Sequence, residues 1–229
     1  MYDKNFKRVE KKYLLTEEEK DELFERIKPY IEKDKFYEST IGNIYFDNKN
    51  NDLIIKSIEK PLFKEKIRVR CYGTPNNNDA VFLEIKSKYK GVVGKRRIKM
   101  TLNKFYDFIE NGQYDKNNQI MKEIVYHFNY YKLYPKIYIA YDRKSFRGIE
   151  DHNLRITFDS NLRSRRDNLK LESGSYGESY FETPHYIMEI KTLGSLPLWF
   201  NKILTELKIF PKSFSKYGNI YKKESGIIC

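Results

Sequence analysis

Several short segments of the chain place charged residues at every second position, with apolar residues between them. The segments are Arg8-x-Glu10-x-Lys12, Arg68-x-Arg70, Glu84-x-Lys86 and Glu189-x-Lys191. Because successive side chains of a β-strand point to opposite faces, each segment would have one charged and one apolar face. One such strand is typical of a half-solvated sheet. Several together favour a closed sheet, with the charged faces lining a lumen rich in Lys and Arg and the apolar faces packed outward against helices.

Helices are predicted between the strands. Thr16-Glu17-Glu18-Glu19 is a capping-box signature followed by apolar residues at helical spacing, so a helix is expected over residues 17–34. Further helices are expected over residues 52–59, after the cap at Thr101, and over residues 116–130 and 198–207. Strands are expected at residues 41–47, 66–72, 80–88, 95–99, 136–144, 154–159, 169–171 and 186–192, with a basic loop at 161–167. This pattern predicts one α+β domain over residues 1–229, built on a closed antiparallel β-barrel of about eight strands with peripheral helices.

Charge and cysteine content narrow the possible partners. The chain has 44 Lys and Arg against 32 Asp and Glu, a net charge of +12. This excess favours nucleic acid, anionic lipid or a phosphate-rich molecule as the partner. Two cysteines, Cys71 and Cys229, make no disulfide framework, which favours a reducing compartment, and we expect a cytoplasmic protein. No segment approaches the ~18 apolar residues of a membrane span, so no transmembrane segment is expected.

A set of short motifs follows in order along the chain. They are Arg8-Val-Glu-Lys-Lys-Tyr13, Ile44-Tyr-Phe-Asp47, Lys66-Ile-Arg-Val-Arg-Cys-Tyr72, Phe82-Leu-Glu-Ile-Lys86, Lys95-Arg-Arg97, Tyr141-Asp-Arg143, Arg155-Ile-Thr-Phe-Asp159, Met188-Glu-Ile-Lys191 and Phe214-Ser-Lys-Tyr217. Their order closely resembles the VTC domain, the polyphosphate polymerase branch of the CYTH-like triphosphate tunnel metalloenzymes. The resemblance implies an antiparallel tunnel that binds a triphosphate with a divalent metal and transfers the terminal phosphate of ATP to a growing chain.

Phosphoryl transfer requires that the charge on the phosphate oxygens be neutralised, which Arg does in bidentate geometry and Lys as a point charge. We therefore expect a group of cations to bind the triphosphate: Arg68, Arg70, Lys86 and Arg155. The resemblance adds Lys12 and Lys216 as catalytic residues. It implies further substrate-binding positions at Arg8, Arg143, Lys191, Lys212 and Ser215, and at one or more of Lys95, Arg96 and Arg97. Strand parity favours Lys95 and Arg97 on one face with Arg96 on the other.

The resemblance also indicates where a metal would bind. Glu189 matches the family's metal-binding glutamate. Glu10 is the second candidate, because the related triphosphatase branch carries Glu-x-Glu-x-Lys on its first strand and Arg8 replaces the first acid here. Mn²⁺ or Mg²⁺ suits a carboxylate that shares its ion with phosphate oxygens. Glu84 and Asp159 would either contact the ion or orient neighbouring cations.

The balance of cations and acids bears on the reaction. A hydrolase must hold and activate water, whereas the nucleophile of a polymerase, the terminal phosphate of the chain, is already anionic. Many cations with few acids therefore favour a metal-dependent ATP:polyphosphate phosphotransferase, with ATP or another triphosphate and inorganic polyphosphate as partners and nucleic acid not expected. Two alternatives stay open: a tripolyphosphatase or nucleoside triphosphatase on the same fold, and a non-catalytic domain that binds polyphosphate or another polyanion.

Overall fold

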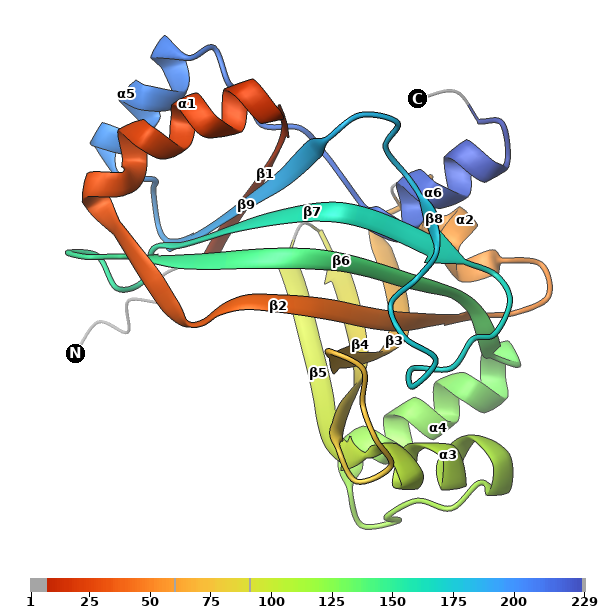
Figure 1. Ribbon diagram of the computed structural model, residues 1–229. Coiled ribbons are helices and arrows are strands. Elements are labelled where there is room, and N and C mark those ends of the chain that lie inside the picture. Colours follow the sequence, from red (N-terminus) through yellow and green to blue (C-terminus); the bar gives the residue numbers. More distant parts are fainter. Residues whose placement is uncertain (1–7, 60, 91, 228–229) are drawn as a thin grey trace. The chain divides into compact units, whose positions relative to one another are not determined.

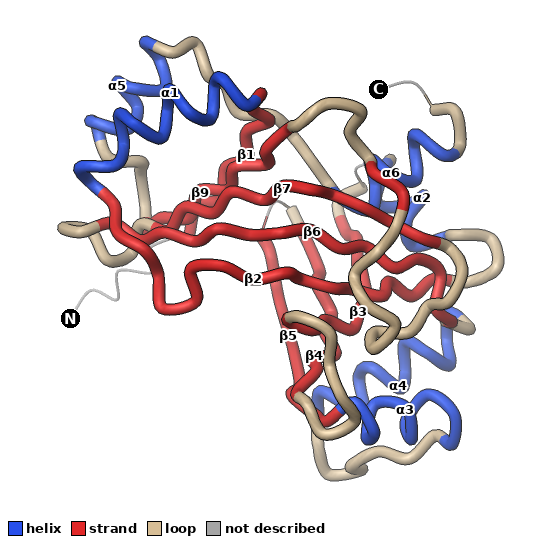
Figure 2. The backbone as a smooth tube through the Cα atoms, in the orientation of Figure 1, coloured by secondary structure: helices blue, strands red, loops and turns tan. Residues whose placement is uncertain are grey.

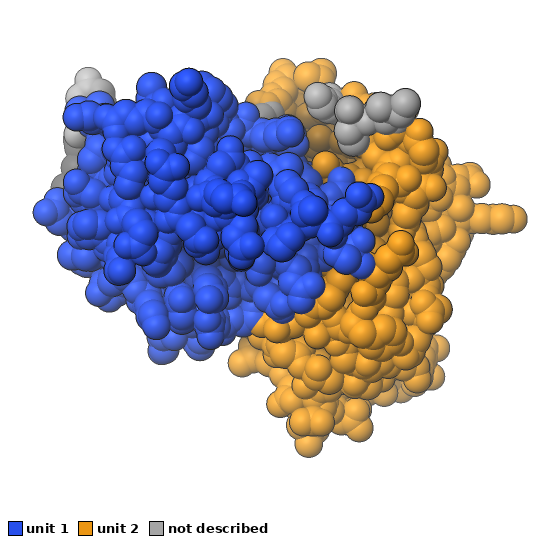
Figure 3. All heavy atoms as spheres, turned by 45° about the horizontal axis from the view of Figure 1, so that its top comes forward, with its two compact units in different colours: residues 1–39, 141–162, 179–215 blue, residues 40–140, 163–178, 216–229 orange. Residues whose placement is uncertain are grey.

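The computed structural model of this protein describes residues 8–59, 61–90 and 92–227, and the side chain of Arg8 lies outside the description. The chain divides into two compact units, each assembled from segments distant in sequence (Figure 3). Unit 1 comprises residues 1–39, 141–162 and 179–215, and unit 2 comprises residues 40–140, 163–178 and 216–229. The single domain expected over residues 1–229 stays a prediction.

The strands form a large sheet (Figure 1), which Figure 2 shows in red. Its hydrogen-bonded order is β1 (Arg8–Thr16), β9 (His185–Leu193), β7 (Arg155–Arg165), β6 (Tyr134–Gly148), β2 (Ile31–Asp47), β3 (Phe63–Tyr72), β4 (Ala80–Tyr89) and β5 (Val92–Thr101), and the short β8 (Glu178–Ser179) pairs with β7. The β1–β9, β7–β9, β2–β3, β3–β4 and β4–β5 pairs are antiparallel. The expected α+β class is confirmed. Within the described ranges no hydrogen bonds join β5 to β1, so the expected closed barrel is not confirmed.

In unit 1 the apolar faces of the strands pack against α1 (Glu17–Ile27) and α5 (Leu198–Glu206), which lie side by side in Figure 1. Met188 and Ile190 of β9 belong to the same buried cluster as Leu23 of α1 and Phe200 of α5. The capping box at the start of α1 is confirmed. Thr16 Oγ1 accepts a hydrogen bond from the Glu19 N–H at 3.2 Å, and the Thr16 N–H donates to the Glu19 carboxylate at 2.9 Å.

In unit 2 the apolar faces of β3 and β4 pack against α3 (Leu102–Asn111) and α4 (Gln119–Tyr131). Ile67, Val69, Leu83 and Ile85 are at most 3% exposed, as the alternation of the sequence predicts. Unit 2 also contains α2 (Asp52–Ile58), close to the expected range, and α6 (Lys216–Glu224), which was not predicted. No helix within the described ranges is long and apolar enough to cross a membrane.

Three predictions of secondary structure were wrong: the helix over residues 17–34, the loop at residues 161–167 and the strand at residues 169–171. The helix expected over residues 17–34 ends at Ile27, continues as a 3₁₀ turn (Lys28–Tyr30) and gives way to β2, because Pro29 lacks the N–H that an α-helix would need there. The basic loop expected at residues 161–167 is mostly strand, since β7 runs to Arg165.

The segment after β7 is held by one buried arginine. Arg165 lies between the rings of Tyr138 and Tyr176 and donates hydrogen bonds to the carbonyl oxygens of Lys170 at 2.9 Å and Gly174 at 3.0 Å. The segment is thus bonded to an arginine side chain, and residues 169–171 do not form the expected strand.

Candidate functional site

Side chains from adjacent strands line up across the polar face of unit 2. Residues directly opposite one another in an antiparallel pair share a face. The strand registers place Tyr45 of β2, Arg68 of β3, Glu84 of β4 and Arg97 of β5 in one such row. The flanking rows are Asn43, Arg70, Phe82 and Lys99 on one side, and Lys66, Lys86 and Lys95 on the other. In this part of the face the cations greatly outnumber the acids.

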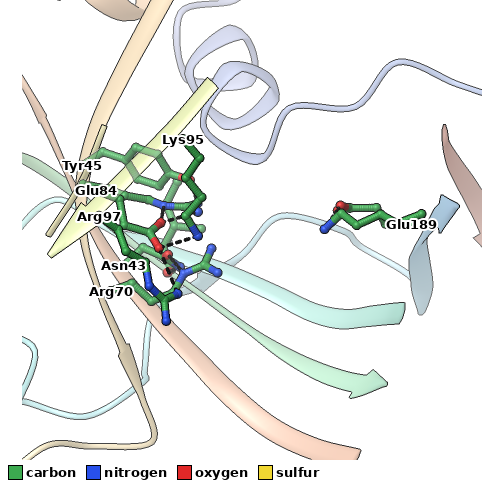
Figure 4. Close-up of polar contacts among 10 residues, drawn as sticks. Asn43, Tyr45, Arg70, Glu84, Lys95, Arg97 and Glu189 are labelled. Carbon is green, nitrogen blue, oxygen red and sulfur yellow. Dashed lines mark hydrogen bonds and ion pairs between the residues drawn. The ribbon is translucent and has the colours of Figure 1, made fainter. Parts of the chain in front are cut away.

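Glu84 is the carboxylate around which these cations gather. Its exposed fraction is 0%. The Arg68 guanidinium lies 2.8 Å from Glu84 Oε2, and Glu84 Oε1 lies 2.7 Å from Lys95 Nζ and 3.5 Å from Arg97. Figure 4 shows Arg70, Lys95 and Arg97 close to Glu84. Burial by itself raises the pKa of Glu84, but Arg68, Arg70 and the hydrogen bond from Lys95 outweigh it and lower the pKa to about 2. Glu84 is therefore a fixed negative charge that orients its neighbours.

Two neutral side chains of β2 also position the arginines. Arg68 donates a hydrogen bond to the Tyr45 hydroxyl at 2.9 Å, and Arg70 donates one to Asn43 Oδ1 at 2.9 Å. Asn43 is buried and donates in turn to the Ile139 carbonyl at 3.1 Å. Sequence reasoning missed both residues, although Asn43-x-Tyr45 repeats the alternation seen in the charged segments.

The predicted parity of β5 is confirmed. Lys95 and Arg97 both lie near Glu84, whereas Arg96 pairs with Glu123 of α4. Two neighbouring arginines of the same strand therefore lie in different environments, one on the polar face and one against a helix.

Unit 1 contains a second polar cluster, on β1, β9 and β7. The register places Lys12 opposite Glu189 and Glu10 opposite Lys191. Lys191 Nζ lies 2.5 Å from Glu189, and Lys12 Nζ lies 3.7 Å from Glu10. Thr157 lies opposite Glu189 on β7.

Glu189 is an ionised and nearly buried carboxylate. Its exposed fraction is 8%. Burial opposes its charge, but Lys191, Lys12 and Arg143 together hold the pKa of Glu189 well below its usual range. Asp159 accepts hydrogen bonds from Arg143 at 2.5 and 2.8 Å, so it orients that guanidinium.

The residues of unit 1 fit a metal ion only in part. Glu189 and Glu10 supply carboxylate oxygens, the donors that Mg²⁺ and Mn²⁺ accept, although each lies next to a lysine. Among the described residues no group of three or more His, Cys, Asp or Glu side chains could hold a metal ion. Two carboxylates would supply only part of the octahedral oxygen shell that Mg²⁺ takes.

The other predicted site residues lie in several places. Arg155 is opposite Lys191 in the register, but its guanidinium pairs with Asp34. Lys212 has an exposed side chain, and its backbone N–H donates to the Lys12 carbonyl at 2.8 Å. Ser215 is half-buried at the end of a unit 1 segment, and the half-buried Lys216 begins α6 in unit 2. The roles of all the predicted site residues stay predictions, and the Arg8 side chain lies outside the described residues.

The fold resembles solved structures of low sequence identity. One is a putative adenylyl cyclase from Hippeastrum, described as having a dominant triphosphatase activity, with a TM-score of 0.60, 17% identity and 97% of both chains covered. Another is a putative adenylate cyclase from Bacillus halodurans, with a TM-score of 0.56, 13% identity and 91% and 94% of the two chains covered. At these identities the likeness shows the fold alone.

The chain belongs to the VTC domain family, whose model matches residues 7–224, so the resemblance seen in the motifs is confirmed. It is 23% identical over 225 residues to vacuolar transporter chaperone complex subunit 4 of Schizosaccharomyces pombe. It is 26% identical over 224 residues to the subunit of the same name from Trypanosoma cruzi. These alignments cover 79% of this chain but only 31% and 28% of the relatives, so the chain spans about a third of their length or less.

The depressed pKa of Glu84 predicts a pH-dependent contribution to stability. The pKa is about 2 in the folded protein against an ordinary 4.5, so the charge stabilises the fold fully above about pH 4.5 and ceases to do so as the pH falls towards 2. Glu84→Gln should lower the free energy of unfolding by up to about 3 kcal/mol at pH 7, and this difference should shrink between pH 4.5 and 2. Urea unfolding across this range, with the exposed Glu182→Gln as control, measures it. If the unfolding free energies of the variant and the unmodified protein differed by the same amount at every pH, the role assigned to Glu84 would be contradicted.

Proposed function

We propose that this chain is a metal-dependent polyphosphate polymerase that transfers the terminal phosphate of ATP to a growing polyphosphate chain. The observation that carries the proposal is the excess of cations on the polar face of unit 2, where Arg68, Lys95 and Arg97 surround a single buried carboxylate. Membership of the VTC domain family supports a polyphosphate-related function. ATP as donor, Mn²⁺ or Mg²⁺ as the ion, an enclosed tunnel and a cytoplasmic location are parts of this proposal.

The chemistry of the residues suits the joining of two anions. In polymerisation both the donor triphosphate and the end of the acceptor chain are negatively charged, so catalysis requires that their mutual repulsion be neutralised. Arginines provide paired donors in a fixed plane, and lysines provide mobile point charges. The γ-phosphate passes to the terminal oxygen of the chain, and ADP leaves. Glu84 holds Arg68, Lys95 and Arg97 together and orients them, and its pKa of about 2 makes it a weak base for activating a water molecule.

Glu189 is the residue that we assign to the metal, with Glu10 second. When bound, the ion would withdraw charge from the phosphate oxygens. Lys12 and Lys191 keep Glu189 ionised and would contact phosphate oxygens themselves.

The reaction product tests the proposal directly. Incubation with ATP and Mn²⁺ should yield ADP and chain polyphosphate, detected by gel electrophoresis, and omission of the metal should abolish the product. Orthophosphate as the phosphate product would instead identify a hydrolase on the same fold. Binding of polyphosphate without any turnover would identify a non-catalytic domain.

Two adjacent arginines of β5 provide a matched test of the anion site. Arg97→Ala removes a cation from the polar face and should weaken tripolyphosphate binding by about 1.5–3 kcal/mol, the range for hydrogen bonds to charged groups. Arg96→Ala removes the same charge from the face that pairs with α4 and should leave the affinity nearly unchanged. Calorimetric titration of both variants, with melting curves to verify folding, measures the difference. Equal affinities would place the anion elsewhere.

Replacing Glu189 separates metal-dependent catalysis from anion binding. Glu189→Gln removes the carboxylate while keeping its size, so Mn²⁺-dependent ATP turnover should fall to nearly zero. Metal-free tripolyphosphate should bind as well as before or more tightly, because a negative charge has left a cationic cluster. Glu32→Gln, which removes a surface partner of Arg147, should keep normal turnover. Full turnover in Glu189→Gln would refute the metal assignment.

A further inference from the structure

Unit 1 contains a stack of aromatic rings that has no part in the phosphate transfer proposed above. The rings of Phe181 and His185 lie 5.0 Å apart with an interplanar angle of 16°, and the rings of Phe181 and Phe214 lie 6.0 Å apart at 26°. We call Phe181, His185 and Phe214 the aromatic stack. Phe214 is buried, whereas Phe181 and His185 are half-buried. Phe181 is the middle ring, Phe214 is the buried end, and His185 is the half-buried end on which a further planar group can stack.

The ring of His185 is held in place by its own chain. Its Nδ1 atom lies 3.0 Å from the carbonyl oxygen of Thr183 and donates to it. Tyr180, at the start of the loop that leads into β9, packs edge-on against Phe214 at 5.8 Å. A ring fixed in this way loses little conformational entropy when a planar ligand stacks on it.

The stack is connected to the cluster around Glu189. Lys12 lies opposite Glu189 in the register, and its Nζ atom donates to the carbonyl oxygen of Phe214 at 3.2 Å. The pairing of β1 with β9 runs without a bulge from Arg8 to Thr16, so His185 and Glu189 project from the same face of β9. Four residues of strand separate them by roughly 13 Å. A ribose and a triphosphate can bridge a distance of this order.

We propose that the aromatic stack binds the base of the nucleoside triphosphate donor while its phosphates contact the cluster of Lys12, Glu189 and Lys191. This rests on the proposed function. A nucleobase presents a π-face that stacks on aromatic rings whatever its substituents, so the stack favours nucleotides in general without selecting adenine. Polyphosphate has no base. The stack thus distinguishes the nucleotide donor from the polymer that the reaction extends.

A purely structural role predicts something different. If the stack only anchors the segment before α6 against the loop before β9, its disruption would disturb Lys12 through Phe214. Every phosphate ligand would then bind less well. A base-binding role affects only ligands that carry a base.

The test compares two ligands on each variant in the absence of metal. His185→Leu and Phe181→Leu keep apolar volume but remove a planar ring, and each should weaken ATP binding by about tenfold. Tripolyphosphate affinity should stay the same. His185→Phe should restore ATP binding because it restores the ring. Phe36→Leu, which removes an exposed ring elsewhere in unit 1, should change neither affinity.

A second measurement needs no substitution. The unmodified protein should bind ATP about tenfold more tightly than ribose 5-triphosphate, which carries the same phosphates without the base. Equal affinity for these two ligands, or equal loss of ATP and tripolyphosphate binding in the Leu variants, would overturn the base-binding proposal. Failure of the unmodified protein to bind tripolyphosphate would instead overturn the proposed function.

Discussion

Side chains alternate between the two faces of a strand, so the cationic face of the sheet depends on burial of the apolar face opposite it. Cations on neighbouring strands repel one another, by about 4 kcal/mol for a pair 4 Å apart in partly polar surroundings. Such a face persists only if something else holds the strands in place. Here the opposite faces of the same strands supply that stabilisation, because Ile67, Val69, Leu83 and Ile85 are buried against α3 and α4. Burial of one face thus makes a cationic face on the other possible.

Two glutamates show how position changes the chemistry of one residue type. Glu84 is fully buried and contacts three cations, so it is a counter-charge that fixes their geometry. Glu189 retains some exposure and has its closest contact with the flexible ammonium of Lys191. An ammonium on a long side chain can turn away to admit another cation, whereas Glu84 also contacts the planar guanidinium of Arg68, which is held in addition by the Tyr45 hydroxyl. This difference favours Glu189 over Glu84 as the metal ligand.

The amino-acid sequence determined the features that depend on local geometry. The period of two in a strand separated Lys95 and Arg97 from Arg96, and the structure confirms that separation. The capping box at Thr16 could also be predicted from the sequence, because its hydrogen bonds join residues three positions apart. The ordered motifs indicated the VTC domain family because they are spread along almost the whole chain, from Arg8 to Tyr217. In each case the signal lies within a few residues or within a fixed repeat.

Only the tertiary structure decided which distant residues meet. Tyr45 and Asn43 contact Arg68 and Arg70 across a strand pair, and Asp34 pairs with Arg155 although 121 positions separate them. The Lys12 ammonium reaches the carbonyl of Phe214, 202 positions away. These contacts depend on strand register and on the packing of segments far apart in sequence. Such long-range contacts produce no repeating pattern in the sequence from which they could be predicted.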